Sequence, residues 1–260
     1  MLKRSPFGVV RAVTFALVLR EMRGRFGKVR MGAFWTLAEP LAHILIVAVV
    51  FGYLRSRRLP GFDYAVFLLT GLGPFLLFKN TALRLIDSAD ANKALFAYRQ
   101  IKPLDTFFAR AIVEFSLATI VYILLLIGFG WYGYDISVTS PLEWLGILGI
   151  GFIFAIFLGI IFAVLVEAAP EFRFFIRLMF LPMYFLSGVI FPPFHMPPQI
   201  LPYLMWNPFL HIIELIRFNV FSFYPMAYGV SLGYVLKCTL ITGFVALGLY
   251  RIRRFHLQAS

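Results

Sequence analysis

The sequence predicts an all-α polytopic membrane protein with six transmembrane helices. Of its 260 residues, 61% are hydrophobic and only 14% are charged, and no soluble domain of that length can hide so much apolar surface. Six segments are long and apolar enough to cross a bilayer, which takes about 20 residues each. The formal charge of +12 comes from Lys and Arg residues that cluster beside these segments, as is typical of the cytoplasmic side of a membrane protein.

These observations also exclude several classes of protein. The charge does not indicate nucleic-acid binding, because no soluble domain remains to hold a duplex. The single cysteine, Cys238, lies inside an apolar stretch and has no partner for an intrachain disulfide. The first twenty residues lack a small-residue cleavage site, so we expect no removable signal peptide.

Residues 1–33 are expected to form a cytoplasmic interface helix. The stretch from Phe7 to Leu19 is mostly apolar but too short to cross, and the chain after it is basic. This favours a helix lying in the interface plane over the alternative, a disordered basic tail. The junction from Gly24 to Pro40 then places basic side chains directly before Trp35. That order is typical of a cytoplasmic membrane boundary and predicts a cytoplasmic N-terminus.

Residues 34–250 are predicted to hold the six spans of a single domain. Between the fifth and sixth spans, residues 192–228 begin with a run of prolines. The apolar run that follows, Phe209 to Tyr224, would make a helix of only about 24 Å, which is short of the roughly 30 Å hydrocarbon core. We therefore expect a re-entrant helical hairpin on the outer face. The predicted spans are 34–54, 65–83, 105–130, 144–166, 174–192 and 229–250.

The distribution of basic residues predicts that both chain ends are cytoplasmic. Eight Lys and Arg precede the first span, and the cytoplasmic tail, residues 251–260, has three more. A seventh span would place that tail outside, against the positive-inside rule. The outer segments contain four basic residues, which are Arg55, Arg57, Arg58 and Arg217.

Two cytoplasmic loops are predicted to dock on a soluble partner. The first, Asp87 to Lys102, begins with residues that favour a helix N-cap and ends before Pro103, so it is expected to be a short amphipathic helix. It contains four large apolar or aromatic side chains, which an ordinary solvated connection, the alternative, does not need. The second loop, Glu167 to Arg177, is short and contains Phe172.

The sequence lacks the motifs of the common enzyme and nucleotide sites. Gly27-Lys28 is followed by Val29 and lacks the upstream glycine that the motif requires, so there is no phosphate loop for ATP. There is no Gly-x-Ser-x-Gly elbow and no His-Glu-x-x-His, and the four histidines have no metal-ligand spacing. We therefore predict no catalytic residue, no metal and no cofactor on this chain.

Charged residues inside the predicted spans are candidates for function, because burying them in a membrane is costly. Glu39 and His43 lie four residues apart and share a helix face. Lys79 and Arg110 have two interpretations: they reach the inner headgroups as long side chains do, or they form a basic lining for an anionic substrate. Lys237, in the last span, is a further intramembrane charge, and Glu114 lies one turn after Arg110.

Three motifs resemble one known family. The run Arg25-Phe26-Gly27-Lys28-x-Arg30-x-Gly32-x-x-Trp35-x-x-x-x-Pro40 is similar to the N-terminal signature of ABC-2-type permeases that export polysaccharides. The stretch Ser187 to Arg217 resembles the outer-face signature of that family, and Pro170-x-Phe172-Arg173 resembles its second cytoplasmic loop. Within the family, the resemblance is closest to the permease subunit of Gram-negative exporters of group 2 capsular polysaccharide.

This resemblance implies a homodimer in the bacterial inner membrane, with two separate ATPase chains that carry ATP and Mg. The pore would lie between the two permease chains, and the two cytoplasmic loops would couple them to the ATPases. The substrate would be a lipid-linked acidic polysaccharide, whose phosphate-bearing end the N-terminal helix guides inward. A periplasmic co-polymerase-type adaptor and an outer-membrane channel would complete the system.

The resemblance also assigns candidate site residues. Those for coupling to the ATPase are Lys93, Phe96, Tyr98, Arg99, Glu171, Phe172 and Arg173. Those for the substrate pathway and lipid access are Arg23, Arg25, Lys28, Arg30, Trp35, Lys79, Arg84 and Arg110. Those for an outer gate are Pro193, His195, Trp206, Asn207, Pro208, Glu214 and Arg217, of which the last two are also expected to form a structural pair.

Three alternative functions differ from capsule export. The chain could export another polymer, such as O-antigen or teichoic acid, by the same mechanism. It could be an intramembrane transferase, although it has no cluster of catalytic acids or histidines. It could be a secondary transporter, which would usually show internal repeats, and the sequence shows no convincing repeat.

The outer cluster Arg55–Arg58 departs from typical relatives and would bind the adaptor or the emerging polymer.

Overall fold

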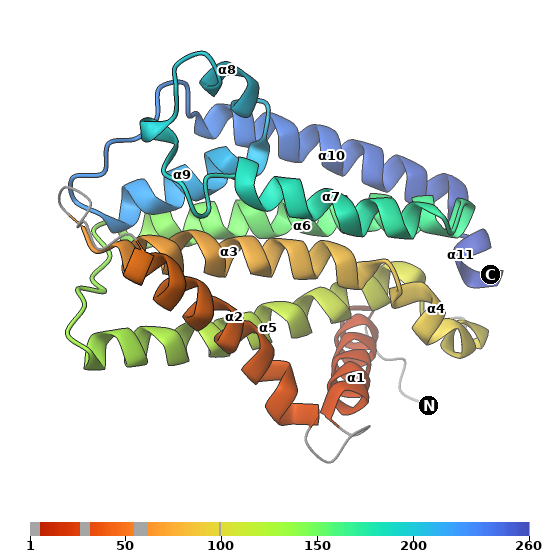
Figure 1. Ribbon diagram of the computed structural model, residues 1–260. Coiled ribbons are helices and arrows are strands. Elements are labelled where there is room, and N and C mark those ends of the chain that lie inside the picture. The colour runs from red at the N-terminus through yellow and green to blue at the C-terminus, as the bar shows by residue number, and fades with distance from the viewer. Residues whose placement is uncertain (1–5, 27–31, 55–61, 99, 260) are drawn as a thin grey trace.

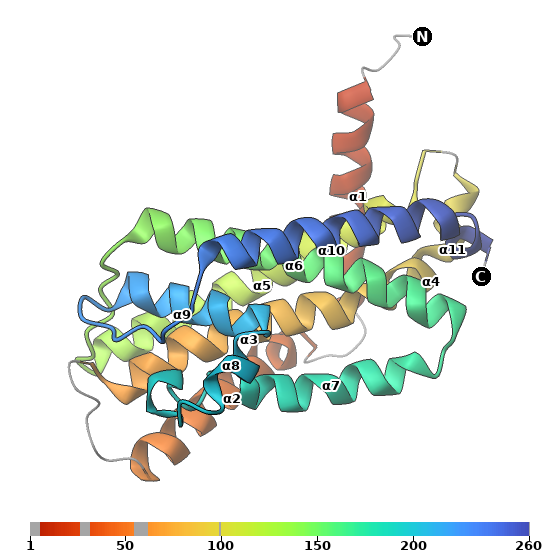
Figure 2. The same cartoon turned by 90° about the horizontal axis from the view of Figure 1, so that it is seen from above.

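The computed structural model describes residues 6–26, 32–54, 62–98 and 100–259, and the elements of this part are helices. The long helices α3, α5, α6 and α10 lie side by side, and α2 crosses them obliquely (Figures 1 and 2). The bounds are α1 Pro6–Phe26, α2 Gly32–Leu54, α3 Tyr64–Leu85, α4 Ser88–Asn92, η1 Lys93–Ala97, α5 Pro103–Trp131, α6 Pro141–Ala168, α7 Phe172–Leu186, η2 Pro193–His195, α8 Leu201–Leu204, α9 Pro208–Val220, α10 Leu232–Arg253 and α11 His256–Ala259.

Four helices of the described chain, α3, α5, α6 and α10, are long and apolar enough to cross a membrane. They coincide with the second, third, fourth and sixth predicted spans. Helix α2, of 23 residues, contains the apolar stretch Leu37–Val50. Helix α7 has 15 residues, which is about 22 Å of helix, and it ends at Leu186 rather than at the predicted residue 192.

The core is centred on α3, which packs against α2, α5, α6 and α9. Its side chains Phe67, Leu68 and Phe78 are fully buried. Helix α6 approaches α3 closely at Gly159, where a Cβ atom would lie 3.0 Å from the carbonyl oxygen of Ala82. Small residues at such contacts let the backbones of two membrane helices come together.

The N-terminal helix α1 packs on α5 near the end of the bundle that also holds α4 and α11, and it then projects away from the bundle (Figures 1 and 2). Apolar side chains lie on more than one side of it. Leu17 is buried, whereas Phe15 and Val10 are exposed. An exposed apolar surface on a basic helix suits the predicted place at a membrane interface.

The loop predicted to be the first cytoplasmic one, residues 87–102, is less helical than the sequence predicts. It forms α4 and the short 3₁₀ helix η1, which ends at Ala97 instead of continuing toward Lys102. Helix α4 begins at Ser88, as expected, but the Asp87 side chain does not cap it. The Asp87 carboxylate instead pairs with Arg173, and this pair competes with the local capping bond.

The opposite end of the bundle holds η2, α8 and α9, where a helical hairpin was predicted (Figure 1). Only α9 is a helix of several turns, and it packs on α3, α6 and α10. Asn207 caps it by accepting a hydrogen bond from the backbone N–H of Phe209 at 3.0 Å. The N–H of Ser140 donates to the carbonyl of Asn219 at 2.9 Å and ties the start of α6 to the end of α9.

Candidate functional site

A cavity of about 710 Å³ lies between α2, α3, α5 and α6. Four of the predicted pathway residues line it together, although they come from three different helices: Arg25, Trp35, Lys79 and Arg84. Glu39, His43 and Glu114, which the sequence marks as intramembrane polar groups, line it as well. The polar side chains of the lining that sequence reasoning did not single out are Asn80, Thr119, Tyr122 and Trp144.

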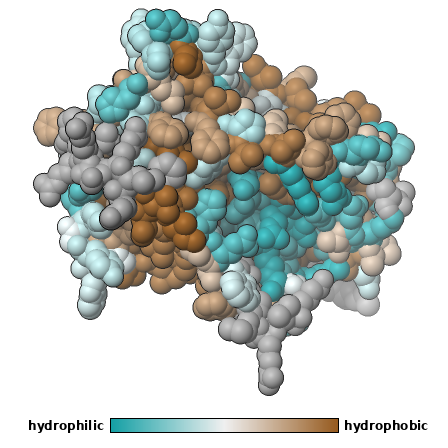
Figure 3. Space-filling view, in the orientation of Figure 1, coloured by the Kyte–Doolittle hydropathy of each residue, from teal (hydrophilic) through white to brown (hydrophobic). Residues whose placement is uncertain are grey.

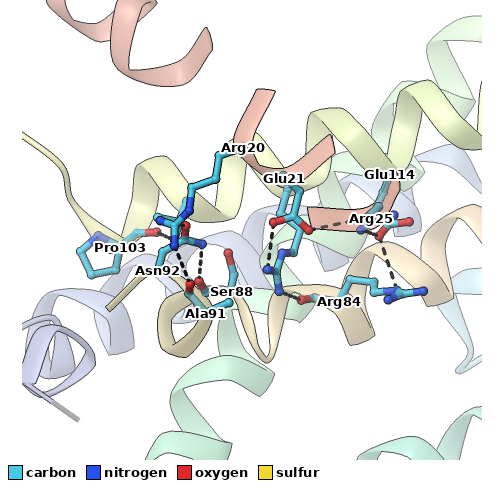
Figure 4. A network of polar contacts seen from close by, with 11 residues as sticks. Arg20, Glu21, Arg25, Arg84, Ser88, Ala91, Asn92, Pro103 and Glu114 are labelled. Carbon is cyan, nitrogen blue, oxygen red and sulfur yellow. Dashed lines mark hydrogen bonds and ion pairs between the residues drawn. The ribbon is translucent and has the colours of Figure 1, made fainter. Parts of the chain in front are cut away.

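An ion-pair network closes the cavity where α1 meets α5. We define the α1–α5 network as Glu21, Arg25, Arg84, Arg110 and Glu114. Figure 4 shows that Arg25 points from α1 toward Glu114 of α5.

The contacts of this network cross between the helices. Arg25 contacts Glu114 and lies 3.5 Å from Glu21. Arg110 reaches back to Glu21 at 2.9 Å and donates to the backbone carbonyl of Arg84 at 3.0 Å. The Arg84 guanidinium lies 3.6 Å from Glu114. Each of the two helices thus supplies one carboxylate to an arginine of the other.

Burial strengthens this network. The side chains of Arg25, Glu114 and Arg110 are only 11%, 8% and 10% exposed. Burial by itself lowers the pKa of Arg25, but the contacts with Glu114 and Glu21 outweigh it and raise that pKa above its ordinary value. The guanidinium therefore stays charged, and the pairs are screened by solvent less than surface pairs are.

Helix α1 also contacts the first of the two predicted coupling loops. Arg20 donates to Asn92 Oδ1 at 2.9 Å and to the carbonyl of Ala91 at 3.2 Å, both at the end of α4 (Figure 4). Asn92 in turn donates to the carbonyl of Ser88 at 2.8 Å. One helix therefore connects the mouth of the cavity with α4.

Two other predicted pathway residues in the described part of the chain, Arg110 and Arg23, do not line the cavity. Arg110 belongs to the α1–α5 network but does not line the cavity. Arg23 is exposed on α1. Lys28 and Arg30 lie outside the described residues, as does the outer cluster Arg55–Arg58.

The two predicted coupling loops lie side by side. Arg173 contacts the Asp87 carboxylate and lies 4.0 Å from Asp90. Arg177 lies 3.8 Å from Asp87. The start of α7 and the start of α4 thus form one charged surface.

The predicted coupling residues differ in exposure. Phe172 and Tyr98 are exposed, as are Lys93 and Glu171. Phe96 instead packs against a second core cluster, and Arg99 lies outside the described residues. Exposed aromatic side chains beside charged ones suit a surface that binds another protein.

Arg217, one of the predicted outer-gate residues, is fully buried. It donates to the carbonyls of Gly188 and Val189 at 2.6 and 2.8 Å and lies 3.4 Å from Glu214. Its guanidinium carbon lies 3.5 Å from the centre of the Phe67 ring. The expected structural pair of Glu214 and Arg217 is therefore present.

Glu214 has further partners. The Tyr224 hydroxyl donates to it at 2.6 Å, and the backbone N–H of Ala227 donates at 3.4 Å. Glu214 is also 0% exposed. In this arrangement the Glu214–Arg217 pair joins α9 to α3, to the residues just after α7 and to residues 224–227.

The remaining predicted outer-gate residues differ in how far their side chains are exposed to solvent. Trp206 is 81% exposed and His195 is exposed. Pro193 and Asn207 are buried, and Pro208 is half-buried. The side-chain amide of Asn207 donates to the Ser187 hydroxyl at 2.9 Å, which joins the end of α7 to the start of α9.

Comparison with known proteins agrees with the resemblance in the motifs. The chain matches the ABC-2 type transporter family over residues 12–221. It is 40% identical over 257 residues to the polysialic acid transport protein KpsM of Escherichia coli, and the aligned region covers 99% of each chain. It is 28% identical to the capsule polysaccharide export inner-membrane protein CtrC of Neisseria meningitidis serogroup B, over 96% of this chain and 94% of that protein.

A third relative is similar over most of its length. The chain is 25% identical to the capsule polysaccharide export inner-membrane protein BexB of Haemophilus influenzae, over 92% of this chain and 89% of that protein. The family match spans most of the described helices, and the identity with KpsM extends over nearly the whole sequence. This chain therefore belongs to the ABC-2 type transporter family.

Proposed function

We propose that this chain is the transmembrane permease subunit of an ATP-driven exporter that moves lipid-linked capsular polysaccharide out of the cytoplasm across the inner membrane. The observation that carries the proposal is the similarity over nearly the full length to inner-membrane proteins named for capsule export. The absence of a phosphate loop in the sequence supports a separate ATPase chain that binds ATP and Mg.

The surface around α3 supports a pore between two copies of the chain. Figure 3 shows a hydrophilic area over the C-terminal half of α3 and its neighbours, bordered by hydrophobic surface. The side chains of Arg84, Arg177 and Asp87 in this region are 59%, 56% and 40% exposed. Charged surface of this kind is costly against lipid. We propose that it faces the second copy in a homodimer and lines the path of an acidic polymer.

We also propose six spans, with α2 and α7 added to the four long helices, and a re-entrant α9. In support, the C-terminal ends of α6 and α10 lie with α1 and α4 at one end of the bundle (Figure 1). The two ends meet through an ion pair in which Arg253 lies 3.0 Å from Glu167. Basic residues gather at this end, which is the pattern of a cytoplasmic face. The adaptor and the outer-membrane channel would approach the opposite end, near the exposed Trp206.

Export in a capsule-deficient strain tests the function. We expect a strain that lacks its own permease, and has a matching ATPase, to regain surface capsule when it expresses this chain. The chain should also co-purify with that ATPase. Polymer that stays in the cytoplasm although the chain co-purifies with the ATPase would overturn the assignment to capsule export.

The coupling surface has its own test. We expect charge reversal at Lys93 or Arg99, or Phe172→Ala, to lower export per ATP hydrolysed without loss of the folded protein. Unchanged export in all three variants would contradict the coupling role.

The polymer path has a separate test. Lys79→Ala and Arg84→Ala should slow export of acidic polymer more than export of neutral polymer. Equal effects on the two polymers would indicate that these side chains contact lipid headgroups instead.

Export of O-antigen is the second candidate function. One relative, the O-antigen export system permease protein RfbA of Klebsiella pneumoniae, is 24% identical over 203 residues, which are 75% of this chain. The lower identity and shorter coverage favour capsule. The test uses one strain that lacks its O-antigen permease and one that lacks its capsule permease. If this chain restores export of O-antigen in the first and not of capsule in the second, O-antigen becomes the favoured substrate.

A further inference from the structure

The cavity between α2, α3, α5 and α6 changes in polarity along its length. At one end, Glu114 pairs with Arg25 of α1 and with Arg84 of α3, and Lys79 lies five residues before Arg84 on the same helix. The part along the second half of α5, beyond Leu117, is lined mainly by aliphatic and aromatic side chains. These include Val121, Tyr122, Ile123, Leu126, Trp144, Leu145 and Leu148.

The length of the cavity matches one leaflet of a bilayer. Glu114 and Leu126 both line it, and 12 residues of α-helix separate them, which is about 18 Å at 1.5 Å per residue. Half of the roughly 30 Å hydrocarbon core is about 15 Å. Trp35, Ile123 and Leu145 line the cavity and are also 62%, 49% and 53% exposed. The cavity is therefore open at its side, where lipid surrounds the helices.

The charges at the polar end leave one cation unbalanced. Arg25, Lys79 and Arg84 face two carboxylates, Glu39 and Glu114. Glu114 is paired with both arginines. Within the described part of the chain, Lys79 has no ion pair or hydrogen bond and interacts with Glu39 only electrostatically. A phosphate monoanion would supply the missing charge and acceptors for the Lys79 ammonium and the exposed side of Arg84.

We propose that each chain holds one phosphate-headed lipid of the cytoplasmic leaflet in this cavity, with its phosphate at Lys79 and Arg84 and one acyl chain along α5 toward Trp144. The site lies within a single chain, so it does not depend on the second copy. The phosphate-headed lipid has two sources: an ordinary membrane phospholipid, or the lipid end of the polymer that the proposed function exports.

Native mass spectrometry of the full chain, purified in a mild detergent, tests the site. We expect one lipid of phosphate-containing mass to stay bound per chain. Lys79→Gln combined with Arg84→Gln should weaken its retention about tenfold, the effect of losing roughly one charge-assisted contact. Arg251→Gln is the matched control, because Arg251 is exposed on α10 and does not line the cavity.

A second variant tests the acyl-chain end without a change of charge. Ala118→Phe places a ring inside the cavity, which Ala118 lines, and should also displace the lipid. Ile120→Phe is its control, because Ile120 lies on the same helix, is exposed and does not line the cavity. Elution volume and unfolding temperature show whether each variant is folded.

The outcomes distinguish the two sources of the lipid from each other, and they also show whether the proposed site exists. A phospholipid mass that persists in a host without polymer synthesis identifies a resident lipid. A lipid that is present only in a polymer-producing host identifies the lipid end of the substrate. Retention that is equal in the folded cavity variants and their controls, or a bound lipid without phosphate, would overturn the site. Because no step measures export, these results are independent of whether the chain exports capsule.

Discussion

Arg217 shows how one buried charge can fix the position of three separate segments. It belongs to α9, donates to carbonyls just after α7 and reaches the Phe67 carbonyl of α3 at 3.3 Å. Gly71 gives it space, because a Cβ atom there would lie 2.2 Å from its Nη2 atom. An arginine can satisfy several carbonyls at once through the fixed fork of its guanidinium, which no apolar residue can do.

We expect Arg217→Met to destabilise the protein by about 3–5 kcal/mol, because it leaves the Glu214 carboxylate buried without its cation. The unfolding temperature in detergent measures the loss. Arg177→Met, at an exposed ion pair, should stay within about 0.5 kcal/mol of the unchanged protein.

The double variant Arg217→Met with Glu214→Leu distinguishes a buried ion pair from simple packing. Removing both charges is expected to cost less than removing Arg217 alone, since no uncompensated charge remains. This account would be contradicted if the double variant lost as much unfolding free energy as the two single variants lose together.

At the scale of elements, the attachment of α1 depends on the α1–α5 network. We expect Glu114→Gln to loosen α1, because Arg25 and Arg84 lose their shared carboxylate and hydrogen bonds to charged groups contribute roughly 1.5–3 kcal/mol each. Trypsin should then cut after Arg23 or Arg25 about tenfold faster, the factor that corresponds to about 1.4 kcal/mol.

Two further variants define this test. Glu143→Gln, at an exposed carboxylate of α6, is the control and should not alter cleavage. The exchange Arg25→Glu with Glu114→Arg should recover part of the protection. Equal cleavage of the Glu114→Gln variant and the unchanged protein would show that packing alone holds α1.

The C-terminal helix α11 is a second attached element. Leu257 is only 3% exposed and belongs to a core cluster with Leu85, Ala89 and Phe107, so the predicted tail is partly docked on α4 and η1. We expect Leu257→Asp to increase hydrogen exchange in residues 88–97, because a carboxylate cannot stay in that cluster without a partner. Phe255→Ser, at a side chain that is 64% exposed, should leave the exchange unchanged.

The helices were predictable where a long apolar run defines them, as in α5 and α6, which have 29 and 28 residues and exceed the roughly 20 residues that a span needs. The α1–α5 network was not, because Arg25 and Glu114 are 89 positions apart and nothing local indicates that they meet. Asp87 occupies the N-cap position of α4, as its local pattern indicates, but its carboxylate pairs with Arg173 of α7, a residue 86 positions away that nothing local indicates. The grouping of Lys79 with Glu39 in one cavity likewise depends on how α2 crosses α3.

At the scale of the whole molecule, different contacts hold the two ends of the bundle. Ion pairs dominate the end with α1, α4 and the C-terminal part of α10, such as the pair of Arg253 with Glu167. At the other end the contacts are backbone hydrogen bonds, aromatic packing and the buried Glu214–Arg217 pair. The ion pairs and basic residues of the described chain at the first end agree with a cytoplasmic face there.

Cysteine labelling in spheroplasts tests this orientation. The native cysteine is first removed by Cys238→Ala, and one new cysteine is introduced at a time. Tyr228 and Phe255 are suitable positions, because they lie at opposite ends of the bundle and are 93% and 64% exposed. We expect a membrane-impermeant maleimide to label Tyr228→Cys in intact spheroplasts, and Phe255→Cys only after lysis. The reverse pattern would invert the proposed topology. Labelling of both positions from outside would place α10 entirely on one side of the membrane and rule it out as a span, although its length and apolar composition allow it to cross.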